Sequence, residues 1–153
     1  KFIGKDNVSL VLGDNIFYDN EKLPKLLDEA ITNLKNNLCT IYGKKVKNPS
    51  EFGIAYFDKK NKLIDIIEKP KKILSNIAVV GLYFFTNDVV KKVNLIEPSK
   101  RGELEITSLI KIYIDDGKVI LKNIKNIFWA DCGTFDSLLR SSLKIKELIN
   151  KKY

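Results

Sequence analysis

The chain of 153 residues is long enough for one domain with a sizeable core, and its composition, 44% hydrophobic and 30% charged, is ordinary for a globular protein. It contains no His, which excludes His general bases, His-activated nucleophiles and His metal ligands from this chain. Its apolar runs are far shorter than the roughly 20 residues that a membrane span needs, and no basic leader precedes an apolar stretch, so we expect a cytoplasmic protein without a membrane partner.

The net charge of +8 is one mark of proteins that bind nucleic acids. Such proteins usually gather Lys and Arg on one face, often together with aromatic residues on which bases stack. Here the 27 basic residues are scattered along the chain, and the Lys pairs fall mostly in expected turns or on polar helix faces. We therefore expect no nucleic-acid partner.

The first half of the chain alternates between strand-like and helical segments. Residues 8–13 form a short apolar run that ends in Gly, which is typical of a buried strand. Residues 22–37 carry Leu, Ala and Ile at helical spacing, with a Pro tolerated in the first turn, and predict a helix. A further strand is expected at 38–46, and the β-rich runs 53–58 and 63–68, separated by KKNK, predict a hairpin.

The second half continues the alternation. The apolar run 78–85 predicts a strand, and Thr86 or Asn87 is expected to cap a short helix that reaches Val93. Residues 103–116 predict a helix that Gly117 ends. The remaining expected elements are two strands at 118–124 and 127–131, then a last helix at 135–149 capped by Thr134.

Strands that alternate with helices predict an α/β fold with a mixed, mostly parallel sheet flanked by helices, the hairpin making the sheet mixed. No linker, repeat or low-complexity tract divides the chain, so we expect a single domain over 1–153. The chain begins with Lys rather than Met, and the last helix has no natural ending signal. We therefore expect a piece of a longer protein that is incomplete at both ends.

The two cysteines are far apart in the sequence. Cys39 lies in the apolar run LCTIYG, and Cys132 follows the strand-like run near the C-terminus. Two distant cysteines form neither a metal motif nor a disulfide framework. We therefore expect reduced thiols, with one of them buried, rather than a disulfide.

Two aspartates follow predicted strands directly. Asp14 comes after the run 8–13, with Asn15 beside it, and Asp131 follows the run IFWA. In open α/β sheets ligands collect at the carboxyl ends of the strands. Two such carboxylates can converge on Mg²⁺, which typically binds one or two carboxylates together with phosphate oxygens and waters. The alternative is two unrelated turn-forming aspartates.

Two basic residues stand where a phosphate could be bound. Lys69, in the sequence Glu68-Lys69-Pro70, can meet a phosphate as a point charge, although the pair is equally consistent with a solvated strand end. Arg101 is one of two arginines in a Lys-dominated chain, which suggests bidentate phosphate contact. The other, Arg140, falls in the middle of a predicted helix and is expected to be a surface charge.

Six segments occur in the order and approximate spacing of one known family. They are LVLGDNIFY (10–18), FGIAYFD (52–58), IEKP (67–70), GLYFF (81–85), RGELEIT (101–107) and WADCGT (129–134). The chain thereby resembles the sugar-phosphate nucleotidyltransferases, and within them the bacterial glucose-1-phosphate thymidylyltransferases. The resemblance covers essentially the whole chain but only about the middle half of the family's usual length.

The resemblance implies a Rossmann-like, GT-A-like nucleotidyltransferase fold and the transfer of a nucleotidyl group from dTTP to glucose 1-phosphate, with release of pyrophosphate. It implies that Asp14 and Asp131 hold a catalytic Mg²⁺ and that Lys69 and Arg101 act on the phosphates. It implies that Glu68, Lys69 and Arg101 lie around the sugar 1-phosphate and that Gly53 and Val79 line the sugar pocket. Asn15, beside Asp14, is a further candidate for contact with the substrate. Cations are needed because two anionic phosphates must approach each other.

The chain departs from the family pattern in several places. The 153 residues contain no glycine-rich loop of the form GGxGTRL, so the dTTP site is expected to be incomplete and the chain inactive alone. The family's C-terminal helices, often used in oligomer contacts, are also missing, and we expect a homo-oligomer at full length. Cys132 replaces a more usual Thr. Two alternatives stay open: a uridylyl- or cytidylyltransferase on the same sugar phosphate, and a non-catalytic binding module.

Overall fold

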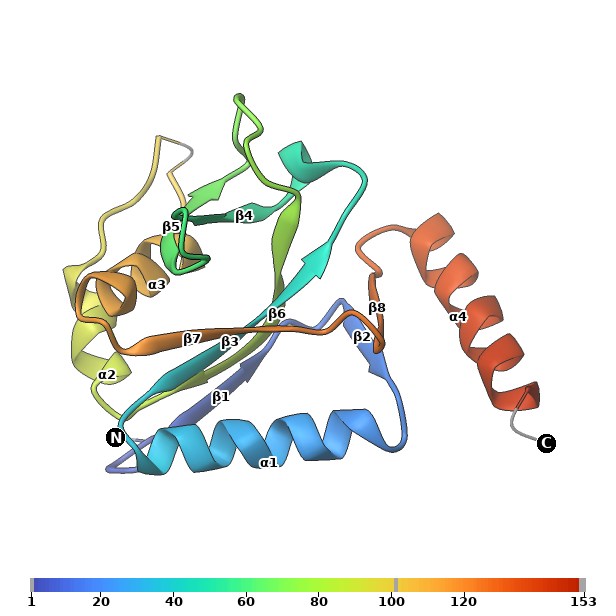
Figure 1. Ribbon diagram of the computed structural model, residues 1–153, viewed down its shortest axis with the longest axis horizontal. Helices are drawn as coiled ribbons and strands as arrows, with labels where there is room; N and C mark the ends of the chain where they lie inside the picture. The colour runs from blue at the N-terminus through green and yellow to red at the C-terminus, as the bar shows by residue number, and fades with distance from the viewer. Residues whose placement is uncertain (1, 101, 152–153) are drawn as a thin grey trace.

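The computed structural model describes residues 2–100 and 102–151 (Figure 1). The strands are β1 (Val8–Val11), β2 (Asn15–Tyr18), β3 (Cys39–Lys45), β4 (Gly53–Phe57), β5 (Leu63–Glu68), β6 (Ile77–Phe85), β7 (Val119–Asn123) and β8 (Phe128–Asp131). The helices are α1 (Lys22–Lys35), α2 (Val89–Lys92), α3 (Ile106–Asp115) and α4 (Phe135–Asn150), with 3-10 turns η1 (Pro49–Glu51) and η2 (Val93–Leu95).

Within the described residues, six strands form one sheet in the order β5-β4-β6-β3-β7, with β1 also paired to β6. The long strand β6 runs antiparallel to β1, β3 and β4, and β4 forms the expected hairpin with β5. Among these described pairs, only β3 and β7 are parallel. The α/β class and the mixed sheet are confirmed, but the expectation of a mostly parallel sheet is wrong.

The physical reason lies in the connections between the strands. A parallel neighbour needs a crossover of a dozen or more residues, usually a helix. From β3 to β6 the described chain contains a 3-10 turn, a tight hairpin and a short irregular segment, but no α-helix. Successive strands joined in this way turn back on themselves, so the centre of the sheet is antiparallel.

The strand β2 is not apparent in the sequence pattern, because it follows β1 after a turn and is only four residues long. The backbone N–H of Asn15 donates to the carbonyl of Leu12 at 3.1 Å, which closes that turn. The chain then leaves the large sheet, and β2 pairs antiparallel with β8 in a separate two-stranded sheet. This pairing places Asn15 opposite Asp131.

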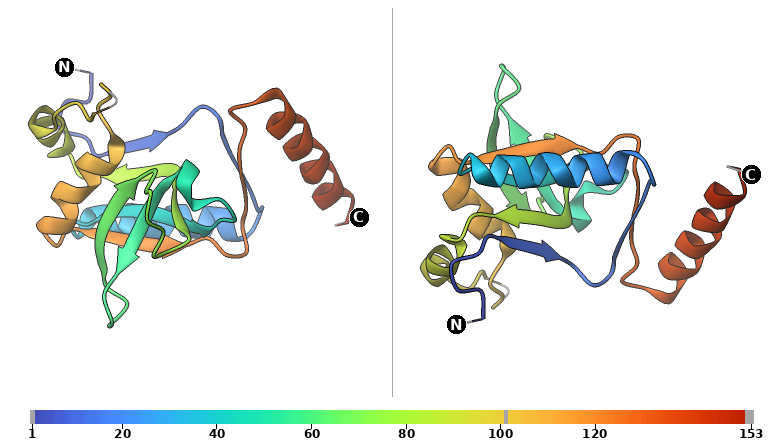
Figure 2. Two further views of the ribbon diagram at one scale, coloured as in Figure 1. Left: turned by 90° about the horizontal axis from the view of Figure 1, so that it is seen from above. Right: turned by 90° about the horizontal axis from the view of Figure 1, so that it is seen from below.

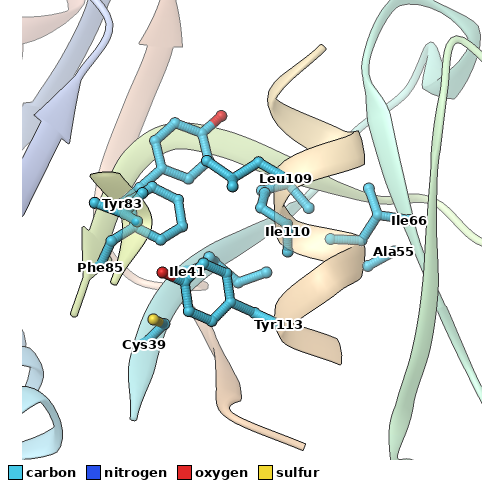
Figure 3. Close-up of a cluster of buried hydrophobic side chains, with 11 residues drawn as sticks. Cys39, Ile41, Ala55, Ile66, Tyr83, Phe85, Leu109, Ile110 and Tyr113 are labelled. Carbon is cyan, nitrogen blue, oxygen red and sulfur yellow. The ribbon is translucent and has the colours of Figure 1, made fainter. Parts of the chain in front are cut away.

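The core has two layers, one on each face of the sheet. Alternate residues of β6 point to opposite faces: Tyr83 and Phe85 pack with α3, whereas Leu82 and Phe84 pack with α1. Figure 3 shows the α3 side, where the Phe85 ring stacks on Tyr113 with centroids 5.5 Å apart. Each large apolar side chain buried here contributes about 1.5–3 kcal/mol.

A polar cluster closes the α3 layer at the end of β6. Asp88 accepts hydrogen bonds from the hydroxyls of Thr86 and Tyr113, and its other carboxylate oxygen lies 3.0 Å from the ammonium of Lys92. Burial by itself raises the pKa of Asp88, but the hydrogen bonds from Thr86, Lys92 and Tyr113 outweigh it and lower the pKa below its usual 3.8. The thiol of Cys39 lies beside Thr86, and burial raises the pKa of this thiol.

The helix ends follow the local signals in part. Thr134 caps α4 as expected, its hydroxyl accepting from the backbone N–H of Ser137 at 3.1 Å in a capping box. The short helix α2 begins after Asp88, so the predicted caps at Thr86 and Asn87 are wrong.

Figure 2 shows α4 standing apart from the sheet, reached through β8. No helix in the described part of the chain is long and apolar enough to cross a membrane.

Candidate active site

The two predicted metal aspartates lie side by side where β1 gives way to β2 and β8 ends. The backbone N–H of Cys132 donates to the carbonyl of Asp14 at 2.7 Å, and the N–H of Gly133 donates to Asp131 Oδ1 at 3.0 Å. A carbon placed at the Cβ position of Gly133 would lie 3.2 Å from Asp131 Oδ1 and 3.5 Å from Asp14 Oδ2. Both carboxylates therefore lie within 3.5 Å of one point, and both residues are exposed to solvent.

This arrangement fits a hard divalent cation. Within residues 2–100 and 102–151 there is no group of three or more His, Cys, Asp or Glu side chains that could hold a metal, so the protein offers a pair of carboxylates. Mg²⁺ is commonly bound by one or two carboxylates, the remaining positions being filled by phosphate oxygens and waters. Gly133 keeps the space between the carboxylates open, because a Cβ there would fill it.

Asn15 is held firmly next to this pair. Its Oδ1 accepts from the backbone N–H of Gly81 at 2.9 Å and from the indole N–H of Trp129 at 2.7 Å, and its Nδ2 donates to Asp14 Oδ1 at 2.9 Å. Gly81 is required for this close approach, because a Cβ there would lie 2.8 Å from Asn15 Cγ. Both ends of the Asn15 amide are thus bonded to the protein, although the residue also lines the neighbouring cavity.

A cavity of about 160 Å³ lies beside the carboxylates, between the β2–β8 pair and the large sheet. Five residues that the sequence singled out line it: Asn15, Gly53, Glu68, Val79 and Asp131. They come from β2, β4, β5, β6 and β8, so the antiparallel pairing of the sheet gathers them at one place. Four of the six residues predicted at the sugar phosphate, together with Asp131 of the predicted metal pair, therefore line one cavity.

The cavity has further wall residues that the sequence analysis did not single out. Thr107 lies so close to Gly53 that a Cβ on this glycine would be 2.7 Å from the Thr107 methyl group and 3.1 Å from Glu68 Oε2. Trp129 packs edge-on against Phe52, with ring centroids 5.7 Å apart. Thr107 is the last residue of RGELEIT and Trp129 is the first residue of WADCGT. The resemblance of these two segments to the family could therefore have pointed to both residues as part of the site.

Of the two predicted phosphate-binding residues, Lys69 lies within the described part of the chain and Arg101 lies outside it. Lys69 follows β5 with a φ of 42°, a left-handed backbone that is uncommon for a residue other than Gly, and its N–H donates to the carbonyl of Phe52 at 3.0 Å. Its side chain is exposed and does not line the cavity. A second cavity of about 360 Å³, lined by Lys100 and Lys111, shares Glu68 and Thr107 with the first.

Burial and charge also affect one aromatic wall residue. Tyr83 is 2% exposed, and its burial, together with the negative charge of Glu68, raises the pKa of its hydroxyl. This tyrosine therefore stays neutral at physiological pH. The charged groups that line the cavity are then carboxylates, namely Glu51, Glu68 and Asp131. A phosphorylated ligand would need cations to accompany it into this site.

The amino-acid sequence is similar to those of known proteins. A family model described as nucleotidyl transferase matches residues 1–147. A glucose-1-phosphate thymidylyltransferase of Neisseria meningitidis serogroup A is 38% identical over 151 residues, which cover 98% of this chain and 51% of that protein. A glucose-1-phosphate thymidylyltransferase of Xanthomonas campestris pv. campestris is 41% identical over 138 residues, covering 90% and 46%. The chain thus spans about half the length of the curated relatives it matches.

Solved structures give the same fold. A Bacillus anthracis protein, assigned as a glucose-1-phosphate thymidylyltransferase and bound to a sucrose, superposes with a TM-score of 0.77 at 36% identity, covering 91% of this chain and 54% of that one. A UDP-glucose pyrophosphorylase complexed with UDP-glucose superposes with a TM-score of 0.81 at 21% identity, covering 95% and 58%. At 21% identity, the second likeness shows the fold alone.

Proposed function

Because the chain belongs to the nucleotidyl transferase family, we propose that it carries the sugar-phosphate site and the metal carboxylates of a glucose-1-phosphate thymidylyltransferase. The proposed reaction joins dTTP and glucose 1-phosphate to give dTDP-glucose and pyrophosphate. The observation that carries this proposal is the convergence of Asp14 and Asp131 beside a cavity lined by Gly53, Glu68 and Val79.

The chemistry proposed for the site is an in-line displacement at phosphorus. A 1-phosphate oxygen of the sugar forms a bond to the α-phosphorus of the nucleotide, and the bond from that phosphorus to the bridging oxygen of pyrophosphate breaks. Both reactants are anions, so their approach needs fixed positive charge nearby. A Mg²⁺ held by Asp14 and Asp131 would supply positive charge and orient the two phosphates.

The protein's own groups have separate tasks in this proposal. Glu68 lies in the cavity wall opposite Gly53 and can accept hydrogen bonds from sugar hydroxyls. Lys69, adjacent in the chain, can place its ammonium against the 1-phosphate as a point charge. Arg101 is proposed for the same phosphate, as a bidentate donor. Gly53 and Val79 line the cavity in which the sugar ring is proposed to lie.

The identities favour dTTP as the nucleotide. The relatives at 38% and 41% identity are named as thymidylyltransferases, whereas the pyrophosphorylase complexed with UDP-glucose shares 21%. A uridylyl- or cytidylyltransferase on the same sugar phosphate is the alternative within the family.

Calorimetric titration of glucose 1-phosphate into the 153-residue chain, with Mg²⁺ present, tests the proposed site. We expect saturable binding that Asp14→Asn and Asp131→Asn weaken, because each loses a charged ligand of the cation that meets the phosphate. One charge-assisted contact is worth about 1.5–3 kcal/mol, so the loss should be roughly ten- to a hundredfold. Asp136→Asn, on the exposed first turn of α4, is the matched control and should bind as the unmodified chain does.

Lys69 has its own matched control two residues further along. Lys69→Met should weaken binding by a similar factor, whereas Lys71→Met, which removes an equally exposed charge, should not. Absence of glucose 1-phosphate binding, or equal losses in all three aspartate variants, would contradict the proposed function.

A further inference from the structure

Asn15 links the wall of the cavity to one of the two carboxylates. A continuous path of hydrogen bonds runs from the indole N–H of Trp129 to Asn15 Oδ1, and from Asn15 Nδ2 to Asp14 Oδ1. The backbone N–H of Gly81, at the centre of β6, makes a second bond to the same Oδ1. The Asn15 amide is therefore anchored to two elements besides its own strand.

The chemistry of the amide allows one orientation of the side chain. If it were turned over, its NH₂ group would face the two N–H donors of Trp129 and Gly81, and its oxygen would face the carboxylate of Asp14. Donors would then oppose donors, and an oxygen dipole would oppose an anion. The two donors at Oδ1 consequently fix the end of Asn15 that meets Asp14.

This orientation also decides which oxygen of Asp14 is directed to a ligand. Nδ2 of Asn15 engages Oδ1, and the other oxygen, Oδ2, lies 3.5 Å from the point next to Gly133 that Asp131 also faces. A carboxylate without such a partner can rotate and lose this direction. Groups that orient a metal ligand in this way typically change metal affinity by roughly ten- to a hundredfold when they are removed.

We propose that Asn15 is a positioning residue, which Trp129 and Gly81 orient so that it turns Asp14 Oδ2 toward Asp131 to receive a divalent cation. The inference rests on the cation site of the proposed function. It also gives Asn15 a role through Asp14 that differs from the contact with substrate expected from the sequence.

Trp129 is the one tryptophan of the chain, which gives the proposal a direct spectroscopic readout. In a ¹⁵N-labelled protein the indole N–H gives a single, assignable NMR signal. Asn15→Leu, which keeps a similar volume and removes the amide, should shift this signal and speed its exchange with water. An unchanged signal would overturn the proposed bond to Trp129.

Cation affinity is measured with Mn²⁺ as the probe, by the loss of the free-ion electron paramagnetic resonance signal. We expect Asn15→Leu to weaken Mn²⁺ binding at least about tenfold. Trp129→Phe, which removes the N–H and keeps an aromatic ring against Phe52, should weaken it by a smaller factor of about two to five, and it serves if Asn15→Leu does not fold. Asn150→Leu, at the exposed end of α4, should leave the affinity unchanged.

Asp14→Asn and Asp131→Asn separate the positioning role from the cation site. If these variants lose Mn²⁺ binding while Asn15→Leu and Trp129→Phe bind as the unmodified chain does, the positioning role is wrong and the cation site stands. If the aspartate variants also bind Mn²⁺ normally, the cation site itself is wrong, and the proposed function loses its central observation.

Discussion

Replacing Lys44 with Met removes the ammonium that holds the connection between β7 and β8. Its Nζ donates to the backbone carbonyls of Ile124, Lys125 and Ile127 at 3.1, 3.1 and 2.7 Å. Ile124 and Ile127 are buried, so their carbonyls have limited access to water as substitutes. The connection leads directly into β8, which ends at Asp131.

The size of the effect depends on these three bonds. A hydrogen bond to a charged group contributes about 1.5–3 kcal/mol, and burial lowers the pKa of Lys44, which means that desolvation of the ammonium offsets part of the gain. Met keeps most of the apolar stem and its packing. We therefore expect Lys44→Met to reduce the free energy of unfolding by about 2–4 kcal/mol, below the full value of three bonds.

Equilibrium unfolding in urea, followed by Trp129 fluorescence, measures this change. With a slope of about 2 kcal/mol per molar, the midpoint should fall by roughly 1–2 M. The matched control is Lys45→Met, the next and exposed residue of β3, which should change the free energy by less than about 0.5 kcal/mol. A midpoint for Lys44→Met equal to that of the control would refute the role of the three carbonyl contacts.

Three further outcomes are expected. Asp88→Asn should cost about 1–3 kcal/mol at pH 7. Because the folded pKa of Asp88 lies below its usual 3.8, the stability that Asp88 contributes is present above pH 3.8 and is lost as the pH falls through the folded pKa. The urea midpoints of the variant and of the unmodified chain should therefore differ at pH 7 and approach each other as the pH is lowered below 3.8. A constant difference between them would argue against the cluster. Gly53→Ala forces its new methyl group onto Thr107. The variant should bind glucose 1-phosphate more weakly in calorimetry, and its free energy of unfolding should fall by about 1–3 kcal/mol. Gly13→Ala, whose new methyl group would meet nothing within 4 Å, should change neither quantity. The 153-residue chain by itself should release pyrophosphate from dTTP and glucose 1-phosphate at least about a hundredfold more slowly than an intact thymidylyltransferase. The reason is that these residues contain no glycine-rich loop of the form GGxGTRL, and the loss of one hydrogen-bond donor to the reacting phosphates costs about 10²-fold in rate. Turnover near that of the Neisseria relative would show that this loop is dispensable.

Elements stabilised by local interactions could be predicted from the sequence. The spacing of the apolar residues placed α1 within two residues of its observed end, and Thr134 was identified as the cap of α4 because a cap acts on residues two or three positions away. The hairpin of β4 and β5 was equally visible, since its turn lies between its own strands. In each case the signal and the structure it causes lie in the same short segment.

The direction of the strands and the short strand β2 were not predictable in this way. Apart from the β4–β5 hairpin, the strands of the large sheet pair with segments that are distant in the sequence. A short apolar run buried on both faces does not state the direction of such a partner. The role of Asn15 depends on the same long-range pairing, since its bonds reach Gly81 in β6 and Trp129 in β8. Its residue type alone was consistent with a turn or with a ligand-facing amide.

By itself, the sequence determined which residues have the charge to bind a cation or a phosphate. The carboxylates of Asp14 and Asp131 and the ammonium of Lys69 have this chemistry wherever they lie in the fold. Tertiary structure alone decided that the two aspartates meet, through the pairing of β2 with β8, and that Gly53, Glu68 and Val79 line one cavity. The physical reason is that helices and caps form from hydrogen bonds between residues close together in the sequence. The site forms where strands from distant parts of the chain meet, and burial of both faces of the sheet brings these strands together.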